Sequence, residues 1–554
     1  MNFNVITKKV ERTKRTKKYE DDNYEVYWEG MPFIKGLAPD EPSVRKYLEQ
    51  IKKYNLNSFI ENLTGIYAFI IYDKKQNIYY LFNDNAGQYN LFKSPNFIST
   101  SYLESIKQNK CKKEDMNPEM VSNFIISDSY MGWRTAFNNI EKIKHNEILA
   151  IKGSNVKIEQ KNLNDIFSIK RFDNKSIIKR IEAIVDSLKQ VNGKIVLDLS
   201  AGHDSRMLST IFVHYGLQFD TFSTGLPNYP DVFLAKKIAN IQGLKHTAHH
   251  HEVNSNTVEQ EINDAFIDFD ACMNILKWHH GYQYQKLKIK EGYKLNLTGH
   301  SGEFYKPMFL WSCADPDPKV AIENLVRKEG GGRRYGTDFS GIPHNIFSNE
   351  YKKLSLGYKN RFKSDLLKHY ANDKTGIVLA KIYYYYMEAG RTTNTYLIDR
   401  YSPLMDRHLI PCGITLKGGL KNDLRDQLKR LFFRPWNDRF LFERKVTTSL
   451  NRKVAKVNIG DALNYNASSS FFDQLNGYIR KKIKWAQRNI KTGPKFHTEF
   501  YSVVKSLPKS SDLMEILKNE NILKSNTKIE DIPNMYLGSL YTIAKLMNFV
   551  NNLN

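Results

Sequence analysis

The chain has 554 residues, enough for two to four domains of roughly 150 residues each. Hydrophobic residues make up 41% and aromatic residues 13% of the sequence, which excludes an intrinsically disordered chain. The formal net charge of +24 allows nucleic-acid, anionic-membrane or polyphosphate partners but does not choose among them.

Cysteine spacing and hydropathy indicate the compartment. Cys111, Cys272, Cys313 and Cys412 are far apart and form no CxxC pair, which argues against a disulfide framework or a zinc module. The basic amino-terminus has no apolar stretch behind it, so no signal peptide is expected. No apolar run approaches the roughly 18 residues of a membrane span. We therefore expect a cytoplasmic protein without a membrane span.

The first third of the chain is rich in short β-type runs, which predicts an α+β fold with antiparallel sheets. Helical spacing of apolar residues interrupts these runs twice. Strands are expected at residues 65–72, 78–82, 89–93 and 147–152, and helices at 42–53 and 118–126.

The pattern changes after a stretch of weak periodicity at 162–176. Strands then alternate with helices, which predicts a parallel, doubly wound sheet. From residue 377 onward only helices are expected, ending in a packed helix at 535–550. The alternating part predicts strands at 194–199, 218–223, 245–249 and 293–298, and helices at 177–189, from 205 and at 231–241.

The sharpest motif, Leu-Ser-Ala-Gly-His-Asp-Ser-Arg at 199–206, lies between a strand and a helix. Small residues let backbone N–H groups point inward, and the hydroxyls of Ser200 and Ser205 with the helix N-terminus complete an anion cradle. Asp204 could hold a Mg²⁺ ion that binds phosphate. The motif lacks the GxxxxGK of a Walker loop. A purely structural strand-to-helix turn is the alternative.

The segment Ser200–Ser205 resembles the S-G-G-x-D-S pyrophosphate loop of the asparagine synthetase family and its relatives. Those relatives include β-lactam synthetases, lasso-peptide cyclases and amidotransferase homologues of surface-glycan clusters. Enzymes of the tRNA-modifying and GMP-synthetase types share the loop, so the loop alone indicates a superfamily. Four further segments are similar to family motifs and follow in the family's order: 221–246, 297–303, 402–408 and 421–425.

The resemblance implies a set of site residues. Asp204 and Glu303 would hold Mg²⁺, and Lys421, Glu303 and His300 would be catalytic. His300 stands where the family usually has a glutamate, which leaves the native substrate open. The nucleotide would bind to Leu199, Ser200, Ala201, Gly202, His203, Asp204, Ser205, Phe222, Ser223, Thr224 and Gly299.

The first third also resembles the family's glutamine-hydrolysing domain, at residues 64–69, 83–87 and 132–140. That activity requires a cysteine that becomes the first residue after Met removal, with its own α-amine as the base. Asn2 stands at this position, and an amide is no nucleophile. We expect a domain without glutaminase activity that supports the synthetase part.

The resemblance implies an α/β protein of two domains. Residues 1–165 would form an α+β sandwich of the Ntn-hydrolase type, and 166–176 a linker. Residues 177–554 would form a doubly wound parallel-sheet domain of the pyrophosphate-loop (adenine nucleotide α-hydrolase) type with a helical carboxyl-terminal part.

The implied reaction is that of an ATP-dependent ligase, with ATP and Mg²⁺ as cofactors. A carboxylate would become an acyl-adenylate with release of pyrophosphate, and ammonia or an amine would then displace AMP. The carboxylate could belong to a small molecule, a peptide or a glycan. A separate glutaminase and a homo-oligomer are compatible with this interpretation, and nucleic acid is not an expected partner. A tRNA-modifying ATP pyrophosphatase and a non-catalytic scaffold are the alternatives.

Two further features are interpreted as structural. The consecutive His249, His250 and His251 would point to alternate faces of a strand, so the three cannot converge well on one ion. We expect a strand end followed by a loop there. The basic run at 480–491 predicts a solvated amphipathic helix.

Overall fold

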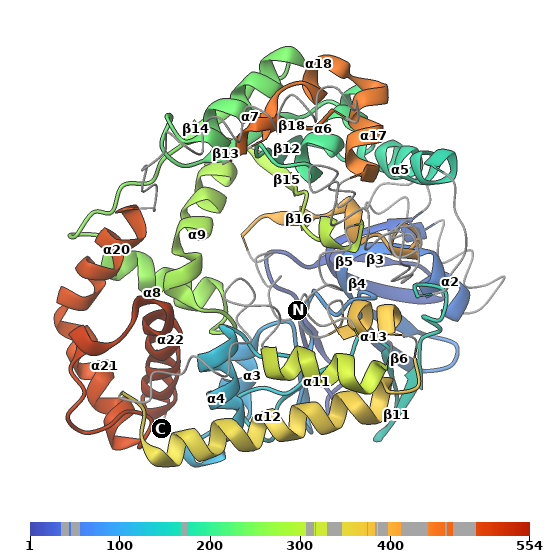
Figure 1. The fold of residues 1–554 in the computed structure, drawn as a ribbon. Coiled ribbons are helices and arrows are strands. Elements are labelled where there is room, and N and C mark those ends of the chain that lie inside the picture. Colours follow the sequence, from blue (N-terminus) through green and yellow to red (C-terminus); the bar gives the residue numbers. More distant parts are fainter. Residues whose placement is uncertain are drawn as a thin grey trace.

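The described residues of the computed structural model form two large antiparallel sheets, one parallel sheet, a small two-stranded antiparallel sheet and helices that surround them (Figure 1). Most of the helix expected at 42–53 and all of the one at 480–491 lie outside the described residues. The structure describes residues 1–34, 44–45, 56–167, 174–305, 315, 317–328, 346–373, 375–382, 385, 397–411, 441–459, 462–468 and 495–553.

A six-stranded antiparallel sheet, in the order β11-β10-β6-β5-β4-β3, is central to the amino-terminal part. In β5 (Leu63–Asp73), Ile66 and Ile70 enter one core while Phe69 and Ile71 enter another. This alternation is the two-residue period of a strand whose two faces are both buried. The other strands are β3 (Lys17–Glu20), β4 (Tyr24–Ile34), β6 (Ile78–Asn83), β10 (Glu147–Lys152) and β11 (Asn155–Gln160).

A smaller antiparallel sheet, in the order β2-β1-β8-β7-β9, packs on one face of the large sheet. Phe3 and Ile98 of the small sheet share a core with Ile66 and Leu149 of the large one. Helices cover both outer faces, so the amino-terminal part has four layers. The elements are β1 (Asn2–Asn4), β2 (Val10–Glu11), β7 (Phe92–Lys93), β8 (Phe97–Ser99), β9 (Glu141–Lys142), α2 (Leu56–Asn62), α3 (Tyr102–Gln108) and α4 (Pro118–Ser127).

The parallel sheet has the order β14-β13-β12-β15-β16. The chain enters at the central strand β12, extends to one side, and then returns to add two strands on the other side. Ligands of such sheets bind outside the carboxyl ends of the strands where the winding reverses. The strands are β12 (Lys194–Asp198), β13 (Asp220–Thr224), β14 (His246–His249), β15 (Tyr293–Leu297) and β16 (Asp399–Tyr401).

Helices cover both faces of the parallel sheet, as expected for a doubly wound arrangement. Ile195 and Leu197 pack with α5 and α6, whereas Val196 packs with Tyr284 and Leu287 of α9. The helices here are α5 (Asn174–Leu188), α6 (Asp204–His214), α7 (Pro230–Ile241), α8 (Val258–Asp268) and α9 (Ile275–Lys290).

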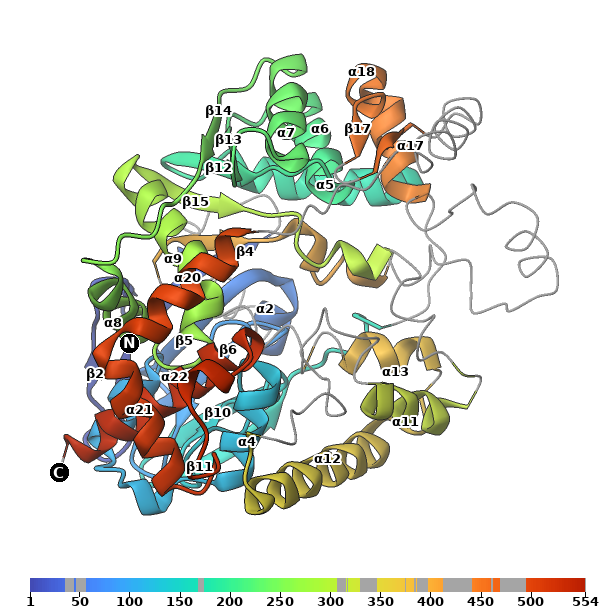
Figure 2. The same ribbon diagram turned by 60° about the vertical axis from the view of Figure 1, so that its left-hand side comes forward.

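Strand β16 joins the parallel sheet to the amino-terminal part. It pairs with β15 and contacts β4 and β5; Figure 1 labels it, and in Figure 2 it is the unlabelled gold strand between β15 and β4. The expectation of helices alone after residue 377 is therefore wrong. The helix expected at 177–189 is confirmed as α5, which begins three residues earlier, at Asn174.

Apart from β16 and a short β17–β18 pair, the elements described in the carboxyl-terminal part are helices. The expected terminal helix is confirmed as α22 (Asn534–Asn551), in which Leu540 and Leu546 are buried. Among the described helices, none combines the length and apolarity needed to cross a membrane. The remaining elements are α11 (Pro318–Lys328), α12 (Asn349–Tyr370), α13 (Thr375–Ile382), α17 (Leu441–Leu450), α18 (Arg452–Ala455), β17 (Asn458–Ile459), β18 (Ala462–Asn466), α20 (Lys495–Ser506) and α21 (Pro508–Asn519).

Candidate functional site

A cleft of about 450 Å³ lies at the carboxyl ends of β12, β13 and β15. Its volume falls within the roughly 300–1,000 Å³ usual for small-molecule sites. Nine of the eleven residues that the sequence assigned to the nucleotide line this cleft. They are Leu199, Ser200, Gly202, Asp204, Ser205, Phe222, Ser223, Thr224 and Gly299.

The loop between β12 and α6 is held by its own side chains. The backbone N–H of Ser200 donates to Ser205 Oγ at 3.1 Å, and that of Gly202 donates to Ser200 Oγ at 3.1 Å. The N–H of Ala201 donates to Asp231 Oδ1 of α7 at 3.2 Å. These three amides already have acceptors, so the two serine hydroxyls and the start of α6 are the groups best placed to meet an anion.

The segment after β15 crosses the N-terminus of α6 at close range. A Cβ atom at Gly299 would lie 2.7 Å from Ser205 N, and one at Gly302 would overlap the Asp204 carboxylate. Glycine at these positions therefore lets the two segments share one rim of the cleft. The backbone of Glu303 follows in the 3₁₀ turn Gly302–Tyr305, but its side chain lies outside the described residues. Its pairing with Asp204 on a metal ion stays a prediction.

The other assigned residues differ in position. Ala201 is fully buried against α7, and His203 is buried immediately before α6, so neither belongs to the cleft lining. His300 is also outside that lining, and its carbonyl accepts a hydrogen bond from Ser402 Oγ at 2.6 Å. Lys421 lies outside the described residues. The catalytic roles of these last two residues stay predictions.

Helix α9 supplies a wall of the cleft that the sequence did not assign. Trp278, Gly281, Gln285 and Lys288 line it at intervals of three and four residues, which places them on one helix face. This spacing is visible in the sequence, but it is equally typical of an ordinary core face.

Lys288 forms a buried charged group in this wall. Its ammonium donates to Asp198 Oδ1 and, at 3.2 Å, to Asn296 Oδ1, and it lies 4.7 Å from the Phe222 ring centroid. Asn296 Nδ2 completes the cluster by donating to Asp198 Oδ2 at 2.9 Å. A cation is thus fixed beside the aromatic ring predicted to meet adenine.

The two faces of β16 serve different neighbours. Ile398 and Arg400 line the cleft. On the other side, Asp399 pairs with Arg15 at 3.2 Å, and the Tyr401 ring lies 4.8 Å from that of Phe33. The cleft is therefore built directly on the amino-terminal part.

Arg206 supports the loop from beneath. Its fully buried guanidinium donates to the carbonyl of Ala201 at 2.8 Å, and to those of Val457 and Asn458 at 2.6 Å each. Burial lowers the pKa of Arg206 to about 9, so the side chain remains charged at neutral pH. It ties the loop to the segment after α18.

His246 supports the opposite rim. Its Nδ1 lies 2.9 Å from Thr221 Oγ1 and its Nε2 lies 3.0 Å from Ser223 Oγ, and Ser223 lines the cleft. Burial, with the charge of Lys236, lowers the pKa of His246 to about 4. The ring is therefore neutral at pH 7 and presents one donor and one acceptor to the two hydroxyls.

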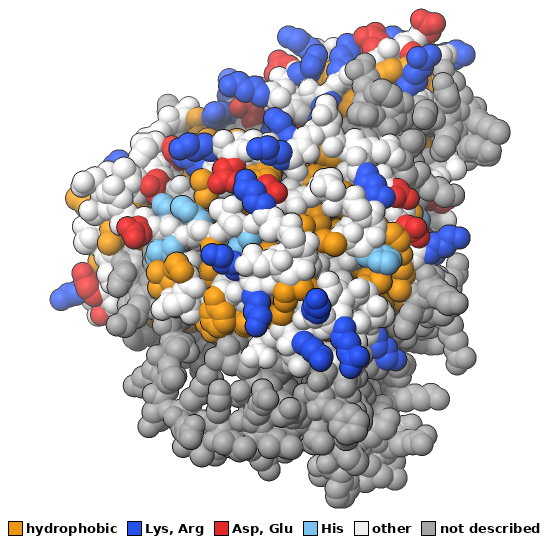
Figure 3. Space-filling view, turned by 90° about the horizontal axis from the view of Figure 1, so that it is seen from above, with side chains coloured by type: hydrophobic (Ala, Val, Ile, Leu, Met, Phe, Trp, Pro, Cys, Tyr) orange, Lys and Arg blue, Asp and Glu red, His pale blue; other side chains and the backbone are white. Residues whose placement is uncertain are grey.

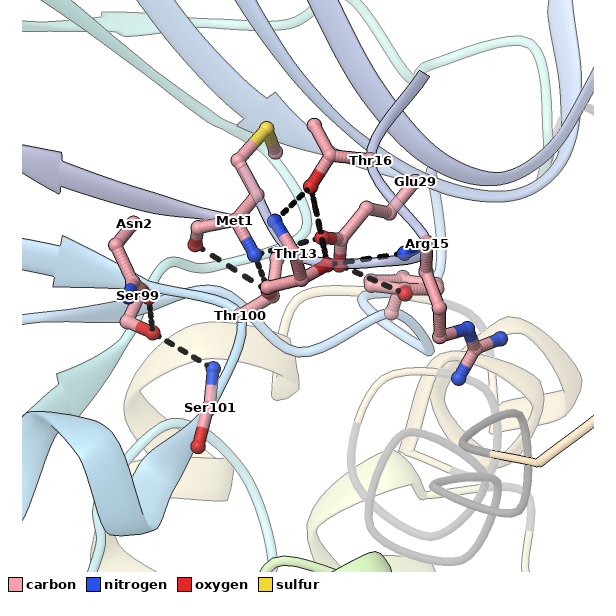
Figure 4. A network of polar contacts seen from close by, with 10 residues as sticks. Met1, Asn2, Thr13, Arg15, Thr16, Glu29, Ser99, Thr100 and Ser101 are labelled. Atoms are coloured by element: carbon pink, nitrogen blue, oxygen red, sulfur yellow. Dashed lines mark hydrogen bonds and ion pairs between the residues drawn. The ribbon is translucent and has the colours of Figure 1, made fainter. Parts of the chain in front are cut away.

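A buried polar network occupies the start of the chain (Figure 4). The α-ammonium of Met1 donates to Glu29 Oε1 at 2.6 Å and to Thr100 Oγ1 at 2.7 Å. Thr13 and Thr16 also donate to Glu29 Oε1, at 2.7 and 2.8 Å. Burial by itself raises the pKa of Glu29, but the ammonium charge and these hydrogen bonds lower it to about 2.

Residues 48–162 match the glutamine amidotransferase domain family. The matched range includes the three segments, 64–69, 83–87 and 132–140, that resemble a glutamine-hydrolysing domain. No curated protein matches the chain. The amino-terminal part is thus an amidotransferase-like domain, and its sheets confirm the predicted antiparallel α+β arrangement.

In this amidotransferase-like domain, Asn2 occupies the place where the resemblance requires a cysteine. Asn2 belongs to β1, and its side-chain oxygen accepts a hydrogen bond from Ser99 Oγ at 2.6 Å (Figure 4). The two described cysteines, Cys111 and Cys272, are buried elsewhere, and burial raises the pKa of both thiols.

Over the upper part of the face seen in Figure 3, Lys and Arg side chains lie among acidic ones. Toward the lower edge of the described residues, several Lys and Arg side chains gather beside apolar ones with no acidic side chain between them. A nucleic-acid groove typically shows a continuous basic stripe along its length. The positive charge on this face is instead unevenly distributed.

Proposed function

We propose that the chain is an ATP-dependent ligase of the asparagine synthetase type that forms amide bonds. The observation that carries this proposal is the Ser200–Ser205 loop at the rim of the 450 Å³ cleft, beside an amidotransferase-like domain. In this proposal the amino-terminal sandwich is of the Ntn-hydrolase type and the parallel sheet is of the pyrophosphate-loop type, with the boundary at 166–176.

The cleft offers suitable groups for ATP and Mg²⁺. The hydroxyls of Ser200 and Ser205 and the N-terminus of α6 would hold the pyrophosphate portion, and residues 222–224 would face adenine. Asp204, on the rim next to Gly302, and Glu303 would hold the magnesium ion. Such an ion supplies positive charge to phosphoryl oxygens, and Lys421 would add to it.

The proposed reaction has two displacements. A substrate carboxylate oxygen attacks the α-phosphorus and pyrophosphate leaves; ammonia or an amine then attacks the acyl carbon and AMP leaves. Because Asn2 offers no thiol, the nitrogen would come from free ammonia, from an amine substrate or from a separate glutaminase. The reaction would take place in the cytoplasm.

The experiment is a pyrophosphate-release assay on the full chain with a panel of carboxylates, with and without ammonium. Asp204→Ala is compared with Asp186→Ala, which removes an exposed acid on α5 that lies outside the cleft lining. We expect release that depends on a carboxylate and is lost only in Asp204→Ala. Equal release in both variants would remove the assignment.

The two alternative functions predict different results in this assay and in binding measurements. A non-catalytic scaffold would not bind Mg²⁺-ATP at millimolar concentration. A tRNA-modifying enzyme would release pyrophosphate only with RNA present, and its RNA binding would weaken steeply with salt. The amidotransferase-like domain favours the ligase over both.

A further inference from the structure

Three side chains of the metal-ligand type converge beside α9. His251 follows β14 by two residues, Glu261 lies on α8 and His279 lies on α9. Glu261 Oε2 is 3.5 Å from His251 Nε2 and 3.0 Å from His279 Nε2. The three ligand atoms all lie within 4.8 Å of one another. Residues from three separate segments thus meet at one point.

The cluster is partly buried, with the His251 and Glu261 side chains 16% and 19% exposed, and neighbouring side chains hold it in place. His279 is fully buried, and its ring stacks on Phe500 with centroids 4.8 Å apart. Glu261 accepts a hydrogen bond from Thr257 Oγ1 at 2.8 Å and another from Gln283 Nε2 at 2.9 Å. Thr257 binds Oε1 and Gln283 binds Oε2, the oxygen that faces the two imidazoles, so the orientation of the carboxylate is fixed.

A simple His279–Glu261 hydrogen bond accounts for two of the three groups. It does not account for His251, whose Nε2 is buried and has no hydrogen-bond partner among the described residues. Its 3.5 Å contact with Glu261 is too long for a good hydrogen bond. A buried imidazole nitrogen aimed at an occupied carboxylate is costly unless something else binds there.

We propose that His251, Glu261 and His279 form a zinc site. Two imidazoles and one carboxylate suit Zn²⁺, with the fourth position left to water. Ligand atoms about 2.0–2.2 Å from a tetrahedral zinc lie roughly 3.3–3.6 Å apart, close to the two separations from Glu261. The two imidazole nitrogens lie at most 4.8 Å apart and would approach each other by up to about 1.5 Å on binding.

The site is consistent with the expectation that the consecutive His249, His250 and His251 do not bind one ion together. His249 ends β14, and of the three consecutive histidines only His251 takes part. The two other ligands, Glu261 and His279, lie on α8 and α9. The packing of these helices against the loop after β14 brings the three side chains together.

The zinc site would stabilise the wall of the cleft that α9 forms. The ring centroid of His249, at the end of β14, lies 5.8 Å from that of Tyr284, and Tyr284 lines the cleft. Trp278 and Gly281, the neighbours of the His279–His280 pair on α9, line it as well. The bound ion would fix the loop after β14 to this helix. The inference concerns a structural ion and does not depend on the ligase chemistry.

The test is zinc binding by the full chain, stripped with a chelating resin and titrated with Zn²⁺ against a chromogenic chelator. We expect one ion per chain, and a loss of roughly 10- to 100-fold in affinity in Glu261→Gln and in His251→Ala. His214→Ala, an exposed histidine on α6, is the matched control and should bind as the wild type does. Unchanged affinity in both site variants, or no binding by the wild type, would overturn the proposal.

The Co²⁺ spectrum of the wild type tests the site without any variant, and therefore does not depend on how well the variants fold. Co²⁺ added to the wild type should give the strong visible absorption of a four-coordinate ion. A weak spectrum typical of six oxygen ligands would contradict the histidine–carboxylate site. Zinc should also raise the thermal midpoint of the wild type and of His214→Ala, but not that of His251→Ala. Equal shifts in all three proteins would refute the assignment.

Discussion

The carboxylate of Asp204 occupies the space that a side chain at Gly302 would need. The two residues belong to the first turn of α6 and to the segment after β15, which are almost a hundred positions apart in the sequence. Their contact fixes where the acid on the cleft rim can point.

Gly302→Ala tests this contact. The added Cβ must displace the Asp204 carboxylate, so we expect pyrophosphate release to fall roughly 10- to 100-fold. Gly357→Ala is the control, because a Cβ there meets only side-chain ends at ordinary distances, the Arg361 guanidinium at 3.5 Å and the Glu119 carboxylate at 3.9 Å. Steady-state assays of both variants, with circular dichroism to check folding, make the comparison. Full activity in Gly302→Ala would show that the position of Asp204 is unimportant.

Arg206→Met should destabilise the chain by about 3 kcal/mol, because three backbone carbonyls lose their charged donor. Urea unfolding measures the change. Arg452→Met, an exposed arginine on α18, should stay within about 0.5 kcal/mol of the wild type. Similar losses in the two variants would mean that burial of Arg206 contributes nothing specific.

Lys288→Met removes the ammonium that Asp198 and Asn296 share. We expect a stability loss of about 1–3 kcal/mol and weaker nucleotide binding, because the cleft wall loses its fixed cation. Lys290→Met, an exposed lysine in the last turn of α9, is the control. Isothermal titration with ATP and urea unfolding are the measurements. Unchanged ATP affinity in Lys288→Met would separate this cluster from ligand binding.

The pKa of His246 predicts a pH dependence. The folded-state pKa of about 4 lies below the usual 6.5, so between these values the unfolded chain binds the additional proton. The contribution of His246 to stability is therefore present above pH 6.5 and is lost as pH falls toward 4. The stability difference between wild type and His246→Gln should grow as pH rises from 4 to 6.5. A difference that does not change with pH would contradict the neutral ring.

The strand–loop–helix unit around Ser200 could be predicted from the sequence because its signals are local. A buried run, small residues and the start of a helix follow one another directly, and nine of the eleven assigned nucleotide residues line the cleft. The strands 65–72 and 78–82 were predicted for the same reason and are confirmed as β5 and β6.

Strand β4 was missed because Gly30 and Pro32 lie within it, and both residues argue against a strand. The pairing explains why they are tolerated. Strand β3 begins at Lys17, opposite Trp28, and does not reach Pro32, so Pro32 has a neighbouring strand, β5, on one side only. The missing N–H of proline costs no ladder hydrogen bond on the open side.

Strand β16 and the cleft face of α9 depend on contacts that are distant in sequence. Asp399–Tyr401 has only three residues, two of them charged, and becomes a strand by pairing with β15. Trp278 and Lys288 show helical spacing, which does not reveal what the helix faces. The meeting of His251, Glu261 and His279 is likewise a product of packing, since no spacing rule links the three segments.

Successive side chains at β16 point alternately to the cleft and to the amidotransferase-like domain, so the register of this strand matters to both. Ile398 and Arg400 line the cleft, whereas Asp399 and Tyr401 contact the amidotransferase-like domain. Deleting one residue here would exchange the two sets, placing an acid in the cleft and an arginine against Arg15. An insertion or deletion at β16 would therefore disturb both the cleft and the amidotransferase-like domain. The two parts can change the length of this strand in evolution only together.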